Sequence, residues 1–414
     1  MERLYTCCAG LDVHKQTVVA CLLRPEREAE QKEIQTFGTT TAALIALREW
    51  LLAAGCTHVA MEATGSFWKP VHNILEGHCT LLVVNAAHMQ AVPGRKTDVR
   101  DAEWIATLLQ HGLLRASFIP SREQRELRDL TRTRTSLIDE RSAAVNRIQK
   151  VLEDANIKLA GVATDIMGKS GRDILAALLG GEMAASTMAN LARGKLRRKR
   201  DALEQALQGR MAAHHRMLIA LHLEHIDLLE EQIAPLSAEI AERLRPCEAV
   251  LVRLETIPGV GRRTAEILAA EMGLDMARFP SAGHLASWAG MCPGVHESAG
   301  KRKSGKRREG NKALRRALTE AARAAARTKK KDRMYLRGQY RRLVVRVGKK
   351  KAAVAVGHTI LRLAYHLLMN ETTYQEHVMI QLDERRRAQT QRRALDQLKA
   401  LGYEVTLTPK EPAA

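Results

Sequence analysis

The hydrophobic pattern divides the chain into an N-terminal part with short apolar runs and a longer part with helical spacing. Five short runs predict strands, at Cys8–Val13, Thr17–Leu23, Glu33–Phe37, Thr57–Met61 and Thr80–Val84. Two amphipathic segments predict helices, at about Thr41–Ala54 and Asp98–Leu114. Strands and helices that alternate in this way predict an α/β domain with a mixed sheet over residues 1–118.

The strand pattern disappears after about Ser121. Apolar residues recur at helical spacing through residues 127–152, and a second set alternates steps of three and four, at Ile226, Leu229, Ile233, Leu236 and Ile240. That second spacing favours a coiled-coil seam, although an ordinary amphipathic helix gives the same short pattern. Glycines between residues 161 and 181 and the basic run Arg193–Arg200 lie between the two segments. We therefore predict a long helical hairpin with an elaborated tip over residues 119–248.

A third, mostly helical region is expected at residues 249–370, followed by a charged tail at residues 371–414. Helices are predicted at Val250–Glu255, Thr264–Met272, Ala282–Ala289 and Lys312–Arg327. The first two flank Ile257-Pro258-Gly259-Val260-Gly261, which is the pattern of a helix-hairpin-helix element. In such an element Gly259 and Gly261 let a phosphate approach backbone N–H groups at a helix N-terminus. A plain turn between two helices is the alternative.

Positive charge is concentrated towards the end of the chain. The formal net charge is +20, and between Lys301 and Lys350 there are 21 Lys and Arg but only 3 acids. Such a concentration favours a polyanionic partner, nucleic acid before membrane. The densest basic residues, which we predict to bind nucleic acid, are Lys301, Arg302, Lys303, Lys306, Arg307 and Arg308. Aromatic residues make up only 3% of the chain, so base stacking is not the expected mode of binding.

Cysteine usage and hydropathy indicate the compartment. The seven cysteines are scattered and form no Cys-x-x-Cys pair, which is typical of reduced thiols in a cytoplasmic protein without zinc. The longest apolar candidate for a membrane span, Ala352–Leu368, is interrupted by His358, Arg362 and His366. We expect a cytoplasmic protein that does not contact a membrane.

Four acids occur where the pattern predicts that they meet. Asp12 lies inside the first apolar run and Glu62 directly follows the fourth, and the ends of such strands are where α/β sheets carry their chemistry. Asp98 and Asp101 lie three residues apart at a helix start and so face the same way. Carboxylates in apolar surroundings are costly unless they are paired, and their oxygens suit Mg²⁺ or Mn²⁺. The set is typical of two-cation sites that act on phosphodiesters, although each acid alone is more often a surface residue.

A second chemical candidate is Ser298. It lies in a glycine-rich, basic segment between Cys292 and Gly305, which we expect to be a flexible loop. A serine hydroxyl needs activation by a base, a metal or a dense positive field, and the cations that follow could hold a phosphate beside it. Ser304 offers an equally available hydroxyl, so the residues alone leave the choice open.

Several short motifs occur in one order over about residues 5–370. They are Gly10-Leu11-Asp12, Glu62-Ala63-Thr64-Gly65, Pro93-Gly94-Arg95-Lys96-Thr97-Asp98 with Asp101, Ile257-Pro258-Gly259-Val260-Gly261, and Trp288-Ala289-Gly290 through Glu297-Ser298-Ala299-Gly300. This ordered set resembles the DEDD transposases of insertion sequences, the serine-bearing elements described as bridge-RNA-guided recombinases.

The resemblance implies a fold and a chemistry for each region. Residues 1–118 would form a RuvC-like domain of ribonuclease-H type, with four catalytic residues that bind Mg²⁺ (or Mn²⁺): Asp12, Glu62, Asp98 and Asp101. The middle would be a coiled coil used for oligomerisation, and residues 249–370 would form a transposase domain with Ser298 as the nucleophile.

The resemblance also implies partners. The serine would attack DNA at the element ends and the target and become covalently linked to it, and strand exchange would pass through a Holliday junction. A structured guide RNA from the element's non-coding end would pair with both DNAs. The protein would act as a homo-oligomer, a dimer or a tetramer, on the nucleoid of a prokaryotic cytoplasm. Base pairing would then read the sequence, and the protein would hold backbones.

Two other functions share parts of the pattern. A metal-dependent resolvase of Holliday junctions would use the four acids and water and leave Ser298 idle. An architectural nucleic-acid-binding protein would use only the basic residues, and its acids would cap helices or face solvent.

Overall fold

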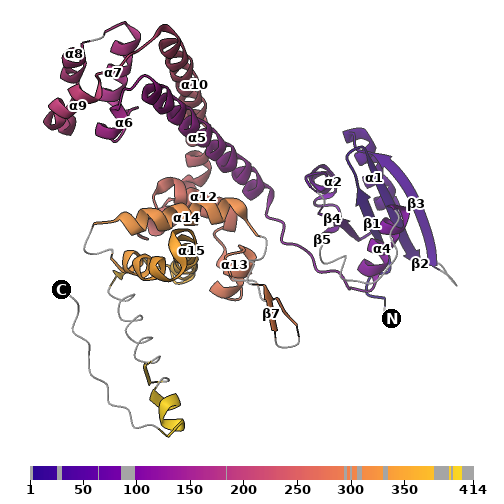
Figure 1. Ribbon diagram of the computed structural model, residues 1–414. Coiled ribbons are helices and arrows are strands. Elements are labelled where there is room, and N and C mark those ends of the chain that lie inside the picture. Colours follow the sequence, from indigo (N-terminus) through magenta and orange to yellow (C-terminus); the bar gives the residue numbers. More distant parts are fainter. Residues whose placement is uncertain are drawn as a thin grey trace. The chain divides into compact units, whose positions relative to one another are not determined.

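The computed structural model describes most of the chain, namely residues 3–25, 30–63, 65–84, 98–182, 184–292, 296–298, 301–304, 310–329, 334–376, 391–392 and 395–402. The side chains of residues 30, 98–100, 296–298 and 301–304 lie outside this description. The chain forms two compact units, Met1–Pro120 and Ser121–Ala414. Figure 1 shows both, the first in indigo and purple and the second from purple through magenta and orange to yellow.

The first unit is a five-stranded mixed sheet with helices on both faces. Its strands are β1 (Cys8–Val13), β2 (Thr17–Pro25), β3 (Glu30–Gly38), β4 (His58–Glu62) and β5 (Thr80–Val84), in the order β3-β2-β1-β4-β5. The pairs β1–β2 and β2–β3 are antiparallel, whereas β1–β4 and β4–β5 are parallel. All five predicted strands form, and the predicted α/β class is confirmed for this unit.

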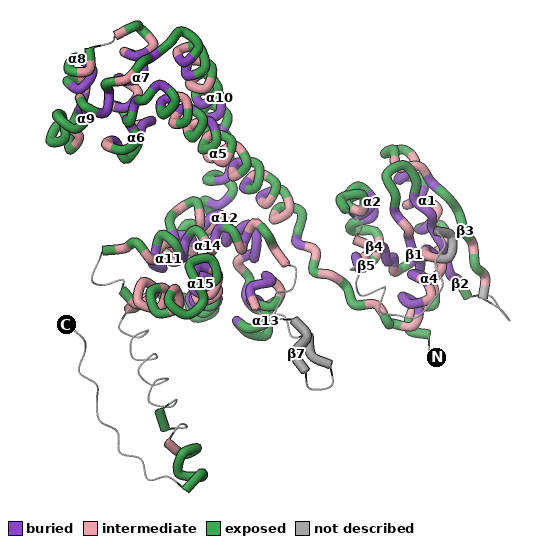
Figure 2. Tube along the Cα trace, in the orientation of Figure 1, coloured by how far each residue is buried: buried purple, intermediate pink, exposed green. Residues whose placement is uncertain are grey.

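The alternation of side chains along β1 determines which helices cover each face of the sheet. Ala9, Leu11 and Val13 belong to a core shared with α1 (Thr41–Ala53) and α2 (Trp68–Leu75). Cys8 belongs to a second core with Ala102, Ile105, Ala106 and Leu109 of α4 (Asp98–Gln110). The central strands are therefore buried on both sides (Figure 2).

Gly10 is the point at which α4 lies closest to the sheet. A Cβ atom at this position would lie 2.3 Å from both the carbonyl oxygen of Ala102 and the backbone nitrogen of Ala106. Only glycine permits such an approach of helix backbone to strand backbone. The conformation of α4 at this place therefore depends on the absence of a side chain on β1.

The second unit begins with two long antiparallel helices, α5 (Arg122–Asp154) and α10 (Ala213–Leu244). Ion pairs between them show the direction: Arg243 pairs with Glu126 at one end, and Arg141 pairs with Glu230 further along. The predicted helical hairpin thus forms, and we refer to it as the arm. Four of the five predicted seam residues of α10 are buried, namely Ile226, Leu229, Ile233 and Ile240. A coiled-coil geometry stays a prediction.

Short helices between α5 and α10 form the tip of the arm. They are α6 (Leu159–Val162), α7 (Lys169–Leu179), α8 (Ala185–Asn190), the 3₁₀ helix η1 (Gly194–Lys199) and α9 (Arg200–Ala206). Their apolar residues share one core with Ile148 and Leu152 of α5 and Ile219 and Ile226 of α10. The tip is therefore a small folded body at the end of the arm (Figure 1).

The remainder of the second unit is mostly helical, as predicted. After the 3₁₀ helix η2 (Arg245–Cys247) come α11 (Glu248–Glu255), α12 (Arg262–Met272), η3 (Met276–Arg278), α13 (Ala282–Trp288), the strands β6 (His296–Ser298) and β7 (Lys301–Ser304), α14 (Lys312–Arg327) and α15 (Tyr335–Met369). Leu127, Ile240 and Leu244 pack in the core of these helices, so the base of the arm is part of it. The division of this unit at residue 248 stays a prediction.

The helix α15 is long and apolar enough, by length and composition, to pass as a membrane span. It is broken at Gly348, where φ is 79°. Its apolar residues after the break, among them Val356, Ile360 and Ala364, are completely buried in the core with α13 and α14. Packing within the protein therefore accounts for its composition.

We expect Gly10→Ala to destabilise the first unit. The added methyl group must displace the α4 backbone, and such overpacking costs about 1–3 kcal/mol of the free energy of unfolding. Gly38→Ala is the matched control, because its Cβ would make an ordinary 3.4 Å contact with the Cβ of Ala43. Chemical denaturation of both variants measures the difference, and equal stabilities would refute the close packing of α4 on β1.

Candidate active site

The register of two parallel strands brings Asp12 and Glu62 together. Leu11 of β1 is paired with Met61 of β4, so Asp12 and Glu62 are the next residues on adjacent strands. Side chains alternate along a strand, so both acids lie on the face of the sheet to which Gly10 belongs. That face is the one covered by α4.

The helix α4 runs against β1 in the opposite direction. The thiol of Cys8 donates to the carbonyl oxygen of Ala106 at 3.8 Å. Gly10, two residues further along the strand, lies against Ala106 and also against Ala102, which is one turn earlier in the helix. Asp12 lies two residues beyond Gly10, towards the first turn of the helix. That turn carries Asp98 and Asp101. The side chain of Asp98 is outside the described residues.

Three elements therefore bring their acids to one end of the sheet, on its α4 face. Glu62 and Asp101 are half-buried, and the side chain of Asp12 is 14% exposed. Oxygen donors from several elements are what Mg²⁺ and Mn²⁺ take in proteins, so this donor set fits the implied cation. By sequence alone we did not select His14, whose Nε2–H donates to Oδ2 of Asp12 at 3.0 Å. Its position two residues after Asp12, on the same side of the strand, was the available signal.

Among the residues that the structure describes, another group brings three possible metal ligands close together. One donor atom each of Asp154, His214 and His215 lies within 4.8 Å of the others. This group is at the arm, not at the predicted acids. His215 already uses both ring nitrogens: Nδ1 accepts from the N–H of Ala212 at 3.1 Å, so Nε2 carries the proton that it donates to Asp154 at 2.9 Å. A ring in that tautomer caps α10 and has no lone pair left for a cation.

Ser298 lies in a β-hairpin, and not in a flexible loop as we expected. β6 and β7 are antiparallel, with Ser298 paired with Lys301 and His296 paired with Ser304. The two serines are thus at opposite ends of the hairpin, Ser298 beside the connection and Ser304 at the base. Short strands with three consecutive cations have low strand propensity, which is why the pattern gave no signal.

The two ends of the serine-bearing segment are held against each other. A Cβ atom on Gly310 would lie 2.4 Å from the backbone nitrogen of Gly290, so the chain after the hairpin touches the chain before it. The next residue, Asn311, caps α14 by accepting from the N–H of Leu314 at 3.0 Å. Its Nδ2 donates to Oε2 of Glu271 at 2.6 Å. The start of α14, which follows the hairpin, is therefore tied to α12.

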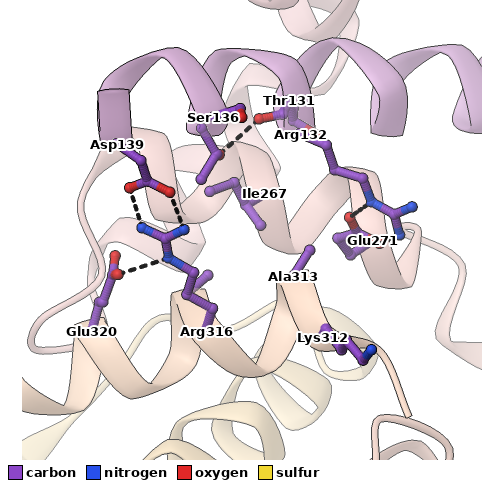
Figure 3. A pocket seen from close by; sticks show the side chains of 12 residues that line it. Thr131, Arg132, Ser136, Asp139, Ile267, Glu271, Lys312, Ala313, Arg316 and Glu320 are labelled. Atoms are coloured by element: carbon purple, nitrogen blue, oxygen red, sulfur yellow. Dashed lines mark hydrogen bonds and ion pairs between the residues drawn. The ribbon is translucent and has the colours of Figure 1, made fainter. Parts of the chain in front are cut away.

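Glu271 is completely buried and joins α5, α12 and α14 (Figure 3). Arg132 of α5 donates to both of its oxygens, at 2.6 and 2.8 Å. These hydrogen bonds raise the pKa of Arg132, whereas burial lowers the pKa of the neighbouring Arg128 to about 10. A second acid of α12, Glu266, accepts from the buried Arg134 at 2.7 Å. Two acids among the apolar residues 265–272 of α12 were the sequence signal for this network, and we missed it.

The same three helices enclose a pocket of 290 Å³, which Figure 3 shows. Arg316 of α14 lies in it and pairs with Asp139 of α5 and with Glu320. The charges of Arg316, Asp139 and Glu320 are therefore matched to one another within the pocket.

The turn between α11 and α12 has the glycines of the predicted helix-hairpin-helix element. Gly259 has φ 87°, and its Cβ would lie 2.2 Å from the carbonyl oxygen of Ala321 in α14. Gly259 thus has a packing role whatever else it does. Gly261 precedes α12 with φ −105°, and a Cβ there would meet nothing within 4 Å. Phosphate binding by these glycines stays a prediction.

Two protein-family models match this chain. A model of the DEDD transposases of IS110, described as "Transposase", matches residues 9–157, and one described as "Transposase IS116/IS110/IS902 family" matches residues 252–337. The chain belongs to this family of insertion-sequence transposases. The first range contains all four predicted acids, and the second contains Ser298 and the basic residues that follow it. The resemblance that the ordered motifs indicated is confirmed.

Similar proteins carry the same description. A probable family 20 transposase of Pseudomonas aeruginosa is 29% identical over 324 residues, which are 76% of this chain and 85% of the relative. The transposase for insertion sequence element IS1111A of Coxiella burnetii is 26% identical over 78% of this chain and 80% of its own length. That of element IS1328 of Yersinia enterocolitica is 26% identical over 67% of this chain and 74% of its own. This transposase is an enzyme of DNA transposition, as predicted.

Gly259→Ala and Gly261→Ala test the packing role of Gly259 in the transposase. We expect the first to lower the free energy of unfolding by about 1–3 kcal/mol, because of its positive φ and its contact with α14. We expect the second to unfold like the parent protein, since its Cβ enters open space. Denaturation curves of the two variants test this, and a stable Gly259→Ala variant would contradict the assigned packing.

Proposed function

We propose that this transposase cuts and rejoins DNA through a serine–DNA intermediate, with the help of Mg²⁺ (or Mn²⁺) at its acidic site. The observation that carries the proposal is the meeting of Asp12, Glu62 and the start of α4 at one end of the sheet. Asp98 and Asp101 complete the set from that helix. When bound there, the divalent cation supplies Lewis-acid stabilisation of negative charge on phosphate oxygens.

The acidic residues of the chain would position the substrate. The carboxylates of Asp12, Glu62 and Asp101 come from two strands and a helix that pack tightly, so we propose that their positions are fixed before substrate arrives. Asp12 is held further by the hydrogen bond from His14. We propose that this rigid acidic site positions the phosphodiester that is to be cut.

Ser298 is the proposed nucleophile because of its place at the end of the hairpin, beside the connection between the strands. Its Oγ would form a bond to the phosphorus as the bond from phosphorus to one deoxyribose oxygen breaks. The hydroxyl proton leaves to solvent or a base, and the released deoxyribose oxygen gains a proton. One phosphodiester replaces another, so no external energy source is needed, and the reverse step rejoins DNA. The neighbouring Lys301, Arg302 and Lys303 would hold the phosphate charge.

The basic residues Lys301, Arg302, Lys303, Lys306, Arg307 and Arg308 would hold nucleic-acid backbones, which carry no sequence information. We therefore propose that a structured guide RNA supplies the sequence reading by base pairing with donor and target DNA. The protein would work on the nucleoid of a prokaryotic cytoplasm.

We also propose that the transposase is a homo-oligomer, a dimer or a tetramer, that associates through the arm. α10 exposes four large apolar residues at helical spacing on the side that does not contain the buried seam: Met217, Leu218, Leu221 and Leu228. An identical stripe on a second copy would cover them, as in a helical bundle.

Asp101→Asn and Glu62→Gln test the acidic site. We expect each to slow Mg²⁺-dependent cutting of element-end DNA by about 100-fold or more, because one ligand and one negative charge are lost. Glu103→Gln is the matched control: this acid lies on the same helix but pairs with Lys32 on the surface. Cutting rates are measured with folding checked by circular dichroism. Unchanged rates in both site variants would exclude the acids from catalysis.

Ser298→Ala and Ser304→Ala test the covalent link. After incubation with element-end DNA, RNA and Mg²⁺, we expect the first variant to form no protein–DNA adduct and the second to form it. Denaturing gels with labelled DNA detect the adduct. An adduct that persists in Ser298→Ala would refute the nucleophile. If the unaltered protein cuts DNA and never forms an adduct, the resolvase function is correct.

A further inference from the structure

The tip of the arm contains a segment that the proposed chemistry does not use. Residues Arg193–Arg200 include six Lys and Arg and no acid. They lie between the two ranges matched by the transposase family models, which end at residue 157 and begin again at residue 252. They belong to the same compact unit as Ser298 but not to its part of the fold.

The fold presents these cations on a fixed surface. Gly194, with φ 55°, turns the chain into η1. Ala192 is buried, and Leu196 packs against the core of the tip, so the segment is anchored from beneath. A 3₁₀ helix repeats every three residues, which places Lys195 and Arg198 in one row about 6 Å apart. Each of the six cations is exposed.

Most of this charge has no acidic partner within the described part of the chain. Arg193 pairs with Asp173 at 2.8 Å. Arg197 and Lys199 donate to backbone carbonyl groups, those of Ala192 and Val162. For Lys195, Arg198 and Arg200 the structure shows no ion pair with any described residue. Like charges held this close repel one another, and a polyanion removes that repulsion.

A hollow beside the run has room for an anionic group. Its volume is 440 Å³, and its lining includes four cations, Lys169, Arg193, Lys195 and Lys199, with Ser170 and one acid, Asp165. The Oδ1 of Asp165 accepts from the N–H of Met167. Hydroxyl and ammonium groups around a hollow of this size suit the oxygens of a phosphate backbone.

The length of the arm indicates which kind of polyanion could contact both of its ends. Leu127 packs in the core of the C-terminal helices and Leu152 in the core of the tip, and both lie on α5. Twenty-five helical residues span about 38 Å at 1.5 Å each. A mononucleotide cannot contact both ends of the arm, whereas a duplex of more than about 11 base pairs can, at 3.4 Å per pair. Figure 1 shows the tip and the α12–α15 region at opposite ends of the arm.

We propose that the tip segment Arg193–Arg200 is a second nucleic-acid contact, which binds the phosphate backbone of the same double helix that the basic residues Lys301–Arg308 hold. This inference rests on the proposed function in one respect, namely that the C-terminal basic residues bind nucleic acid. The arm then acts as a spacer, and binding depends on the length of the duplex.

The test compares 30- and 10-base-pair DNA duplexes on the full-length transposase. The variant replaces Lys195, Arg198 and Arg200 with Gln, and leaves the tip's internal contacts in place. We expect it to bind the 30-base-pair duplex about tenfold or more weakly, with a salt slope reduced by about 2–3, because up to three phosphate contacts are lost. Binding of the 10-base-pair duplex should not change.

A control variant replaces three exposed arginines that pair with acids elsewhere in the unit, Arg122, Arg243 and Arg245. It removes the same net charge and should bind both duplexes like the unaltered protein. An equal loss in the control, or an equal loss on both duplex lengths, would overturn the role of the tip. The same pair of lengths in RNA identifies the source: a defect confined to RNA assigns the contact to the guide, and one confined to DNA assigns it to the substrate.

A third variant, in which the basic residues of Lys301–Arg308 are neutralised, distinguishes the C-terminal contact from the tip contact. If that change leaves binding intact while the tip variant keeps its length-dependent defect, the C-terminal contact fails and the tip contact stands. If the unaltered protein binds neither duplex at low salt, both fail.

Discussion

The position of the acidic site depends on one close contact between backbones, that of α4 on β1 at Gly10. Because no side chain separates them, the helix lies directly on the strand, and its first turn reaches the end of β1 where Asp12 lies. The parallel pairing of β1 with β4 then adds Glu62 from the neighbouring strand. A larger residue at position 10 would move the helix and its acids away from the sheet. Geometry within ångströms is what cation-assisted phosphoryl transfer requires.

In the second unit, buried charge pairs join the arm to the C-terminal helices. Glu271 is buried and accepts from Arg132 of α5 and from Asn311 at the start of α14. Removal of one partner from a buried pair costs about 3–5 kcal/mol, because the other charge is left uncompensated. The same carboxylate thus joins the base of the arm to the start of α14. The arm is thereby joined to the helix start that follows the hairpin carrying Ser298, the proposed nucleophile.

The sequence predicted the elements that local pattern determines. The strands β1 and β5 and the helix α14 begin and end where the pattern indicated, because apolar periodicity and capping residues such as Asn311 are local signals. The helix α2 was missed because Pro70 reads as a breaker, although proline is tolerated in a first helical turn.

Contacts between distant residues could not be read in the same way. No local pattern shows that Gly10 faces a helix ninety residues later, or that Glu271 meets Arg132. The hairpin of β6 and β7 was also beyond the pattern, since its strands are short and highly charged. The acids were proposed because apolar runs around Asp12 and Glu62 marked them. Ser298 was proposed through the family resemblance, because nothing in its immediate sequence separated it from Ser304.

The central claim is that carboxylates from β1, β4 and the start of α4 bind one set of divalent cations. Iron-mediated cleavage of the backbone tests it directly: Fe²⁺ replaces Mg²⁺, and ascorbate with peroxide generates hydroxyl radicals at the bound ion. We predict cuts near residues 12, 62 and 98–101, suppressed by excess Mg²⁺. Cuts near residues 154 and 214 alone, or none that Mg²⁺ suppresses, would contradict the account.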